Sequence, residues 1–544
     1  MFEAITVSSL SKVFPNERPL YPLQSGSCFY NEVYSFQLAF HGDFKRRVRL
    51  RVQTEGLSVT VRTVELVPSF MAQNYEFCDD YTIKKGDTSG YYPDLLLPVG
   101  EEGISLHPYL WQSVWITVRP QSAGKKKIGL EIYEYENPQT LLAFRTFTLD
   151  VLKSRLPELD INYTTWFYYD SLADWYKLPL FGEEYEKVMF AFFKNATEHG
   201  MNTLLTPIFT PPLCTVKGRY NKTVQLVDVK IEKTRYVFGF SRLKRFMELA
   251  QDAGFKFFEM SHLATQWDVS CAPQIVAQEG GETKRIFGWD TPSDGKNYLH
   301  FLDEFLPALD KFLTENEWKN KCFFHVADEP VPNGIENYAK VFETLRKNIP
   351  DCRIIDATTF KEYADKNLTD IPVVATSHFQ NFSVEARKFW VYYCFCQSYD
   401  YLSNRNFNMP SQRNRVMGIQ LYANKVGGFL HWGFNSYYTS MCERLINPYF
   451  ETDAGREYAS GDPYLVYPAE DKTPFDSLRN EVFFDGIQDY RALKLLETIC
   501  GEKFVFSLLE QEGVAGFTVY PRDAAWHIRF REKINRLIAE KAEE

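Results

Sequence analysis

The stretch FFHVADEPVPNG, residues 323–334, begins as an apolar run and ends on two adjacent carboxylates, Asp328 and Glu329, followed by Pro330. Short apolar runs of this kind are typical of buried strands in parallel sheets. Two neighbouring carboxylates repel each other and lose hydration when buried, which tends to keep one of them protonated near neutral pH. Pro330 favours extended backbone at Glu329 and should fix its direction. A simpler interpretation, in which both carboxylates cap the following helical turn, stays open.

Similar apolar runs lie before and after this stretch and alternate with amphipathic segments such as residues 183–200 and 296–317. Eight strands are predicted from residue 161 onward, beginning near residues 161, 202, 255, 322, 353, 371, 390 and 428. Eight strands alternating with helices are typical of a (β/α)8 TIM-like barrel. We therefore expect a barrel over residues 156–500, followed by a C-terminal helical extension over residues 501–544.

The region before the barrel has a different pattern. Residues 1–155 contain short alternating runs, such as RRVRLRVQTEG and SVWITVRP, separated by Gly, Pro and Asn. Alternation of apolar and polar residues over short segments predicts half-buried strands, and many such strands in succession favour a β-sandwich. The expected fold is thus multidomain, with an N-terminal β-sandwich over residues 1–155 ahead of the α/β barrel.

Composition and charge exclude several classes of function. The chain has 544 residues, of which 45% are hydrophobic and 16% aromatic, and its formal net charge of −10 makes nucleic acid an unexpected partner. Neither a signal peptide nor a membrane-spanning segment is evident, so we expect a cytoplasmic protein without membrane partners. The ten cysteines form no CxxC pair, which favours reduced thiols over a disulfide scaffold.

Candidate binding residues gather where the predicted strands end. In barrels of this type the active site lies at the carboxyl ends of the strands, so polar and aromatic side chains there should line one pocket. Trp432 and Trp289 could be sugar platforms, because indole faces pack against pyranose C–H groups, although core packing is an equally good interpretation. The predicted substrate-binding residues are Trp166, Asp170, His262, Trp289, His325, His378, Tyr393, Trp432 and Asn435.

An adjacent Asp-Glu pair suits one particular way of cleaving a glycosidic bond. Cleavage needs an acid for the leaving oxygen and a second negative group for the cationic centre, and the usual two carboxylates stand about 5 to 9.5 Å apart on separate strands. Neighbouring residues, with Cα atoms about 3.8 Å apart, suggest a third arrangement. In substrate-assisted hydrolysis the 2-acetamido oxygen of the sugar attacks the anomeric carbon, while Asp orients the acetamido group and Glu protonates the leaving group.

The chain resembles glycoside hydrolase family 123 with a DUF4091 region. The resemblance rests on WFYYDSLADWY (166–176), FHVADEP (324–330), GGFLHWGFN (427–435) and similar blocks across most of residues 160–500. It implies a β-sandwich followed by a (β/α)8 barrel, and exo-acting, retaining β-N-acetylgalactosaminidase activity on a terminal β-linked 2-acetamido sugar. It also implies that Asp328 and Glu329 are the catalytic pair. Relatives often have His where this chain has Tyr168, which bears on sugar preference.

Other interpretations stay open at this level. Glu259 could be the nucleophile of an ordinary double displacement. His262, His325 and His378 with Asp328 could form the metal site of a metal-dependent hydrolase, but no HxH or HxxxH spacing supports one, so no metal and no cofactor are expected. A non-catalytic carbohydrate-binding protein is the third possibility.

Overall fold

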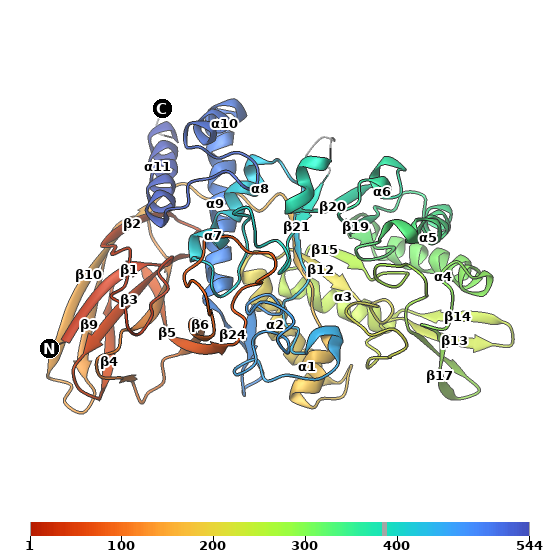
Figure 1. Ribbon diagram of the computed structural model, residues 1–544, viewed down its shortest axis with the longest axis horizontal. Helices are drawn as coiled ribbons and strands as arrows, with labels where there is room; N and C mark the ends of the chain where they lie inside the picture. The colour runs from red at the N-terminus through yellow and green to blue at the C-terminus, as the bar shows by residue number, and fades with distance from the viewer. Residues whose placement is uncertain (1, 383–388, 543–544) are drawn as a thin grey trace.

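The computed structural model describes residues 2–382 and 389–542. Its first part is built of strands (Figure 1, red to orange). Their bounds are β1 Phe2–Ser8, β2 Ser25–Phe29, β3 Tyr34–Gly42, β4 Arg46–Gln53, β5 Leu57–Ser69, β6 Gly90–Pro98, β7 Ile104–Leu106, β8 Gln112–Pro120, β9 Gly124–Glu134 and β10 Leu141–Leu152. They form two five-stranded sheets, in the orders β1-β3-β8-β5-β6 and β2-β10-β9-β4-β7.

The two N-terminal sheets share a hydrophobic core. Alternate residues of β8 and β9 point into it, such as Val114, Ile116, Ile128 and Leu130, because side chains alternate across a strand. Phe36 and Phe147, one from each sheet, stack with ring centroids 4.1 Å apart. This arrangement is compatible with the predicted sandwich.

All eight strands predicted after residue 160 are present. They are β11 Asn162–Thr165, β12 Thr203–Thr206, β15 Phe257–Met260, β18 Cys322–Phe324, β19 Ile355–Thr358, β20 Ile371–Ala375, β21 Trp390–Tyr392 and β22 Gly428–His431. Five pair in parallel in the order β11-β22-β21-β20-β19, and three in the order β12-β15-β18. A parallel bridge between Phe324 and Ile354 links the two sets, and the Asn202 N–H donates to the Tyr163 carbonyl beside β11.

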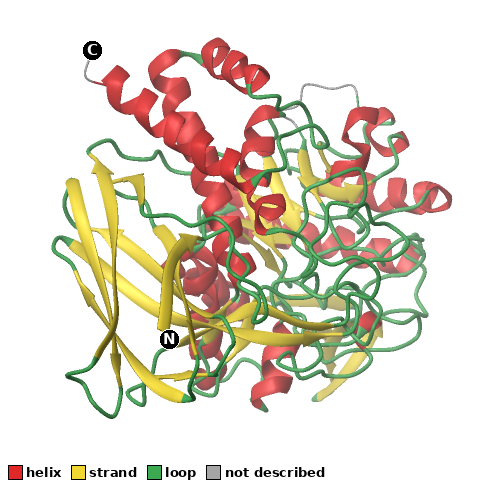
Figure 2. Ribbon diagram, turned by 60° about the vertical axis from the view of Figure 1, so that its left-hand side comes forward, coloured by secondary structure: helices red, strands yellow, loops and turns green. Residues whose placement is uncertain are grey.

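Helices cover these parallel strands, giving a mixed fold of β and α elements (Figure 2). Their bounds are α1 Tyr169–Tyr176, α2 Glu183–Glu198, α3 Ser241–Ala253, α4 Lys296–Glu315, α5 Ile335–Asn348, α6 Glu362–Asp365, α7 Ser411–Arg415, α8 Met417–Ala423, α9 Leu478–Cys500, α10 Glu502–Gln511 and α11 Ala524–Ala542. Gly254 ends α3 with φ 116°, the left-handed conformation that glycine adopts readily. Among the helices described, none combines the length and hydrophobicity that crossing a bilayer requires.

Shorter elements complete the chain. Strands β13 Asp228–Glu232, β14 Arg235–Gly239, β16 Ile275–Glu279 and β17 Glu282–Phe287 form a separate sheet that projects from the molecule (Figure 1). Strands β23 Val466–Pro468 and β24 Pro474–Asp476 form a hairpin before α9. The 3-10 turns among the described residues include η1 Lys319–Lys321, η2 Pro332–Gly334, η3 Thr376–Asn381 and η5 Ser440–Cys442.

Buried arginine–carboxylate pairs join the N-terminal sheets to the rest of the chain. Arg479 of α9 donates two hydrogen bonds of 2.9 Å to Asp94 of β6, and Arg531 of α11 binds Glu32. Breaking a buried pair by removing one partner is strongly destabilising, since the other charge is left without compensation. These pairs therefore hold α9 and α11 in a fixed position against the sheets.

Candidate active site

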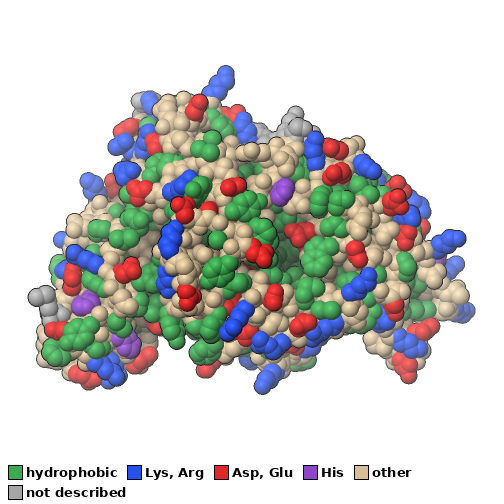
Figure 3. Space-filling view, viewed as in Figure 1, with side chains coloured by type: hydrophobic (Ala, Val, Ile, Leu, Met, Phe, Trp, Pro, Cys, Tyr) green, Lys and Arg blue, Asp and Glu red, His purple; other side chains and the backbone are tan. Residues whose placement is uncertain are grey.

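A cavity of about 110 Å³ opens at the carboxyl ends of the parallel strands. Asp328 and Glu329 are the carboxylates among its described lining residues, and most of the wall is aromatic or apolar. The lining residues are Trp166, Tyr168, Leu213, Cys214, Gln266, Trp267, Asp328, Glu329, Ala357, Tyr392, Cys394, Phe395, Leu430, Trp432 and Tyr458. The space-filling view has a hollow in front of β12, β15 and β21, bordered by hydrophobic and acidic side chains (Figure 3).

Asp328 lies deep in this cavity, with 6% of its surface exposed. Its Oδ2 accepts a hydrogen bond of 2.7 Å from Gln266 Nε2. Burial raises the pKa of Asp328 well above its usual range, and the negative charge of Glu329 adds to this effect. The direction of this shift agrees with the repulsion expected between two adjacent carboxylates.

Glu329 does not have the extended backbone that Pro330 was predicted to impose; that prediction was wrong. Its φ is +45°, in the left-handed region that non-glycine residues rarely adopt. Hydrogen bonds to distant segments enforce this conformation, because the Glu329 N–H donates to the Ala357 carbonyl and the Asp328 carbonyl accepts from the Trp267 N–H. Tertiary bonds thus outweigh the local preference, and such strain is often found at functional sites.

The side chain of Glu329 is held from two sides. Tyr392 donates its hydroxyl to Oε1 at 2.6 Å, and Trp267 Nε1 lies 3.5 Å from Oε2. The second distance is long for a hydrogen bond, so Oε2 is the oxygen with capacity for a further partner. Tyr392 therefore orients Glu329 through Oε1, and Oε2 is free to bind a ligand.

A charged network lies buried beneath the cavity wall. The ring nitrogens of His325 lie 3.0 Å from Asp356 Oδ1 and from Glu259 Oε2, and Trp166 Nε1 donates to the same Glu259 oxygen. Burial opposes the charge on His325, but the hydrogen bonds to Asp356 and Glu259 outweigh it and raise the pKa of the ring to about 9. Glu259 is fully buried and does not line the cavity, so the geometry gives it a role in holding Trp166 rather than in attack on a substrate.

His262 belongs to the same layer. Its ring stacks on that of His325 with centroids 4.3 Å apart, and both of its nitrogens lack a hydrogen-bond partner among the described residues. His262, His325 and Asp356 are close enough to surround a cation, whereas His378 and Asp328 are not part of this group. Both ring nitrogens of His325 face carboxylate oxygens, an arrangement typical of a buried ion-pair network.

Trp432 forms another wall of the cavity. Its Nε1 donates to Asp462 Oδ2 at 2.7 Å, and His431 Nε2 lies 3.2 Å from the other oxygen of Asp462. Tyr168 and Tyr458 contact the indole edge to face, with centroids 6.1 and 5.4 Å away. The buried Asp462 thus fixes the orientation of the indole.

Several predicted binding residues lie outside the cavity wall. The Asn435 amide binds the backbone N–H and carbonyl of Tyr168, each at 3.0 Å, and the Tyr393 ring packs in the core against Phe429. Trp289 Nε1 donates to the Arg219 carbonyl. The other predicted residues that do not line the cavity are Asp170 in α1, His378 in η3, and the buried His262 and His325.

Other lining residues are absent from the predicted substrate-binding residues. Tyr392 faces the cavity in place of its neighbour Tyr393, because the inward residues of β21 are Trp390 and Tyr392, which pack with Trp166. Strand alternation, counted from Trp390, could have identified this face. Gln266, Trp267 and Tyr458 come from loops, where the sequence carries no such periodic signal.

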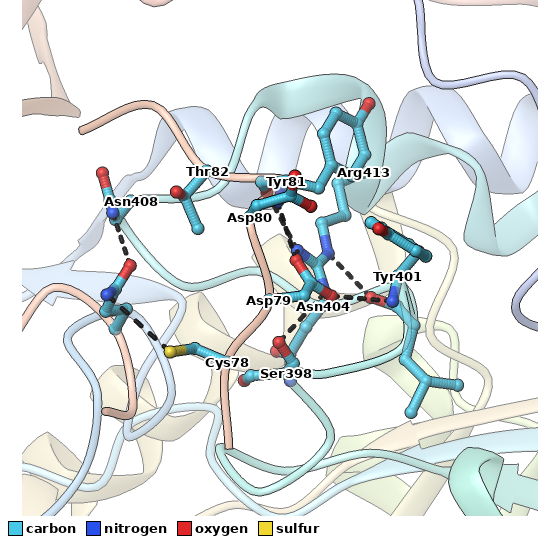
Figure 4. Close-up of polar contacts among 12 residues, drawn as sticks. Cys78, Asp79, Asp80, Tyr81, Thr82, Ser398, Tyr401, Asn404, Asn408 and Arg413 are labelled. Atoms are coloured by element: carbon cyan, nitrogen blue, oxygen red, sulfur yellow. Dashed lines mark hydrogen bonds and ion pairs between the residues drawn. The ribbon is translucent and has the colours of Figure 1, made fainter. Parts of the chain in front are cut away.

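A loop from the N-terminal part positions another segment of the wall. Arg413 forms two hydrogen bonds of 2.8 Å with Asp79 and donates to the Ser398 carbonyl, while the Tyr401 N–H donates to Asp79 (Figure 4). Asn404 Nδ2 in turn donates to the carbonyl of Cys394, a lining residue. The loop that follows β5 therefore supports the segment that carries Cys394 and Phe395.

Comparison with known proteins gives a consistent family match. The model of the glycoside hydrolase 123 catalytic domain matches residues 166–496. A family 123 glycoside hydrolase from Clostridium perfringens, from a study of glycolipid glycan hydrolysis, has a TM-score of 0.75 at 15% identity, with 99% of this chain and 98% of that chain covered. At this identity the similarity concerns the fold. No curated protein matches the sequence.

Two further solved structures are much less similar. Parabacteroides merdae β-glucuronidase has a TM-score of 0.32 at 9% identity, with 90% of this chain and 51% of that chain covered. The Thermobacillus composti GH10 xylanase has a TM-score of 0.29 at 12% identity, with 61% and 100% covered. Neither carries an argument about this fold.

Proposed function

Because the chain belongs to glycoside hydrolase family 123 and is a glycosidase, we propose that it is an exo-acting, retaining β-N-acetylhexosaminidase that uses the 2-acetamido group of its substrate as the nucleophile. The observation that carries this proposal is the pair Asp328 and Glu329, adjacent in the chain and together at the cavity. Glu259, the other carboxylate considered as a nucleophile, is buried against His325 and Trp166. The attacking group is therefore assigned to the substrate itself.

The two carboxylates have different tasks in this reaction. Asp328 accepts the acetamido N–H and stabilises the positive charge that develops as the acetamido oxygen attacks the anomeric carbon. Glu329 gives its proton to the glycosidic oxygen as the bond to the leaving group breaks. The resulting oxazolinium ion is then opened at the anomeric carbon by water, which loses a proton to Glu329. Two displacements at one carbon give net retention.

The raised pKa of Asp328 fits this sequence of events. In the free site the buried Asp328 is the member whose pKa is raised well above its usual range, by burial and by the charge of Glu329. A substrate N–H that binds Asp328 favours its ionised form, because a donor stabilises a carboxylate. Substrate binding should thus favour an ionised Asp328, the form that stabilises the positive charge on the acetamido group.

The cavity wall supports a terminal sugar as the substrate. Its volume of about 110 Å³ leaves no room for a long enclosed chain, and the indole of Trp432 offers an apolar face for pyranose C–H groups. Together with the family resemblance, this favours a β-linked N-acetylgalactosamine at a chain end. The similar enzyme from Clostridium perfringens was studied in glycolipid glycan hydrolysis, which makes glycolipid glycans suitable first candidates.

We further propose that the eight parallel strands close into one (β/α)8 barrel, since the Phe324–Ile354 bridge and the Asn202–Tyr163 hydrogen bond connect the two hydrogen-bonded sets. On this view residues 1–155, 156–500 and 501–544 are the sandwich, the barrel and a helical extension. The catalytic groups then lie at the carboxyl ends of the strands, as in other barrels.

The proposed function predicts that hydrolysis requires the 2-acetamido group. We expect kcat/KM for nitrophenyl β-N-acetylgalactosaminide to exceed that for nitrophenyl β-galactoside by at least about tenfold, because the galactoside has no internal nucleophile. The paired substrates share the leaving group, so the ratio reports the 2-substituent. Equal kcat/KM values for the two substrates would contradict acetamido participation. In a separate measurement, loss of activity on treatment with EDTA would favour a metal-dependent hydrolase. Binding of the sugar without turnover would favour a carbohydrate-binding protein.

A further inference from the structure

Trp267 differs from the other aromatic residues of the cavity wall in its exposure. Its side chain lies at the mouth of the cavity and is 42% exposed, whereas Trp166 deeper in the wall is 2% exposed. Large exposed aromatic side chains at a binding site are candidates for contact with a ligand. The indole of Trp267 therefore faces whatever part of a substrate extends out of the cavity.

The backbone of Trp267 is held rigidly in an unfavourable conformation. Its φ is +64°, in the left-handed region, which is strained for a bulky residue. The Trp267 N–H donates to the Asp328 carbonyl at 3.0 Å, and its own carbonyl accepts from the Val331 N–H at 2.9 Å. The Ser270 N–H also donates to Asp268 Oδ1. The backbone of Trp267 is thus fixed across the segment that carries Asp328 and Glu329, which reduces the ordering that ligand binding requires.

The indole lies beside one particular oxygen of Glu329. Oε1 accepts from Tyr392, so Oε2, 3.5 Å from Trp267 Nε1, is the oxygen available to the leaving group. This step rests on the proposed function, in which Glu329 protonates the glycosidic oxygen. That oxygen belongs to the leaving group, so the first ring of the leaving group must pass next to the indole.

We propose that Trp267 is the platform for the first sugar ring of the leaving group. Its aromatic face packs against the C–H groups of a pyranose, which a leaving group without a ring cannot offer. The residue thereby makes the enzyme prefer glycosides whose leaving group is a sugar. Trp432, which forms another part of the cavity wall, is assigned to the sugar that is transferred.

The test compares two substrates with similarly poor leaving groups. The methyl β-glycoside of N-acetylgalactosamine and a disaccharide in which the same sugar is β-linked to galactose both require the proton from Glu329, but only the disaccharide has a second ring. We expect Trp267→Ala to lower kcat/KM for the disaccharide by about tenfold, mainly through KM, and to change the methyl glycoside by less than about threefold. Trp267→Phe should retain most of the preference.

Two controls make the result decisive. Tyr109 is an exposed aromatic residue with φ 62° that does not line the cavity, so Tyr109→Ala should leave both substrates unaffected. If the alanine variant is unstable, Trp267→Leu keeps an apolar side chain without an aromatic face and carries the same expectation. An equal loss on both substrates, or no loss on either, would overturn the inference. Hydrolysis of neither substrate by the unmodified enzyme would instead overturn the proposed function, and this inference with it.

Discussion

Glu329→Gln should lower kcat for glycosides with sugar leaving groups by about 10²-fold to 10⁴-fold, the range that general acid catalysis contributes. The amide cannot donate an acidic proton, and a sugar alkoxide leaves slowly without one. A dinitrophenyl glycoside should lose far less, because its leaving group departs without a proton. The side chain keeps its contact with Tyr392, since the amide oxygen can still accept from the hydroxyl. The measurement is kcat and KM across a series of leaving groups.

The pH profile gives a second measure of the same substitution. The active form of the Asp328 and Glu329 pair holds one proton, and its loss as the pH rises removes the acid. Because burial and the charge of Glu329 raise the pKa of Asp328, the pair keeps this proton to a higher pH than a free carboxylate would. Glu329→Gln should therefore remove the fall in rate on the basic side for activated substrates.

The matched control for Glu329→Gln is Glu336→Gln, an exposed position at the start of α5. It should leave the rates unchanged. If Glu329→Gln harmed dinitrophenyl and sugar leaving groups equally, Glu329 would not be the acid.

Asp328→Asn should lower kcat by about 10²-fold to 10³-fold, as loss of other electrostatic stabilisers of a transition state does. The positive charge on the acetamido group develops whatever the leaving group is. The kcat values for substrates with activated and with sugar leaving groups should therefore fall by similar factors. Asn can still accept from Gln266, which preserves the local contact while removing the charge. The measurement is kcat and KM across the same series of leaving groups, and kcat should fall by a similar factor for each of them.

The control for Asp328→Asn is Asp365→Asn, an exposed aspartate in α6. If Asp328→Asn were to spare activated substrates while Glu329→Gln did not, the two roles would have to be exchanged. Full activity in both variants would show that this strand end is not the catalytic centre.

Much of the fold could be predicted because it depends on local patterns. The eight strands after residue 160 are short apolar runs between amphipathic segments. The family assignment from the FHVADEP and GGFLHWGFN blocks is confirmed by the matching family model over residues 166–496. Asp328 and Glu329 stand out in the sequence because two adjacent carboxylates at the end of an apolar run are unusual, and both line the cavity.

The rest of the site depends on contacts between segments distant in the chain. Glu329 has a left-handed backbone because Ala357 accepts from its N–H, and nothing near Pro330 reveals that partner. A hydrogen bond from the Trp267 N–H to the Asp328 carbonyl holds Trp267 at the cavity. Cys394 lies at the cavity because Asp79 binds the segment that follows it. Such loop positions carry no periodic signal, so only the three-dimensional structure places them.

Fluorine substitution in the substrate tests the proposed reaction most directly. Nitrophenyl β-glycosides of N-acetyl-, N-fluoroacetyl-, N-difluoroacetyl- and N-trifluoroacetylgalactosamine differ in the electron density on the amide oxygen but little in size. If that oxygen attacks the anomeric carbon while Asp328 stabilises the developing charge, kcat/KM should fall steeply with each added fluorine. A kcat/KM that stays constant across the four substrates would contradict participation of the acetamido group and the account built on it.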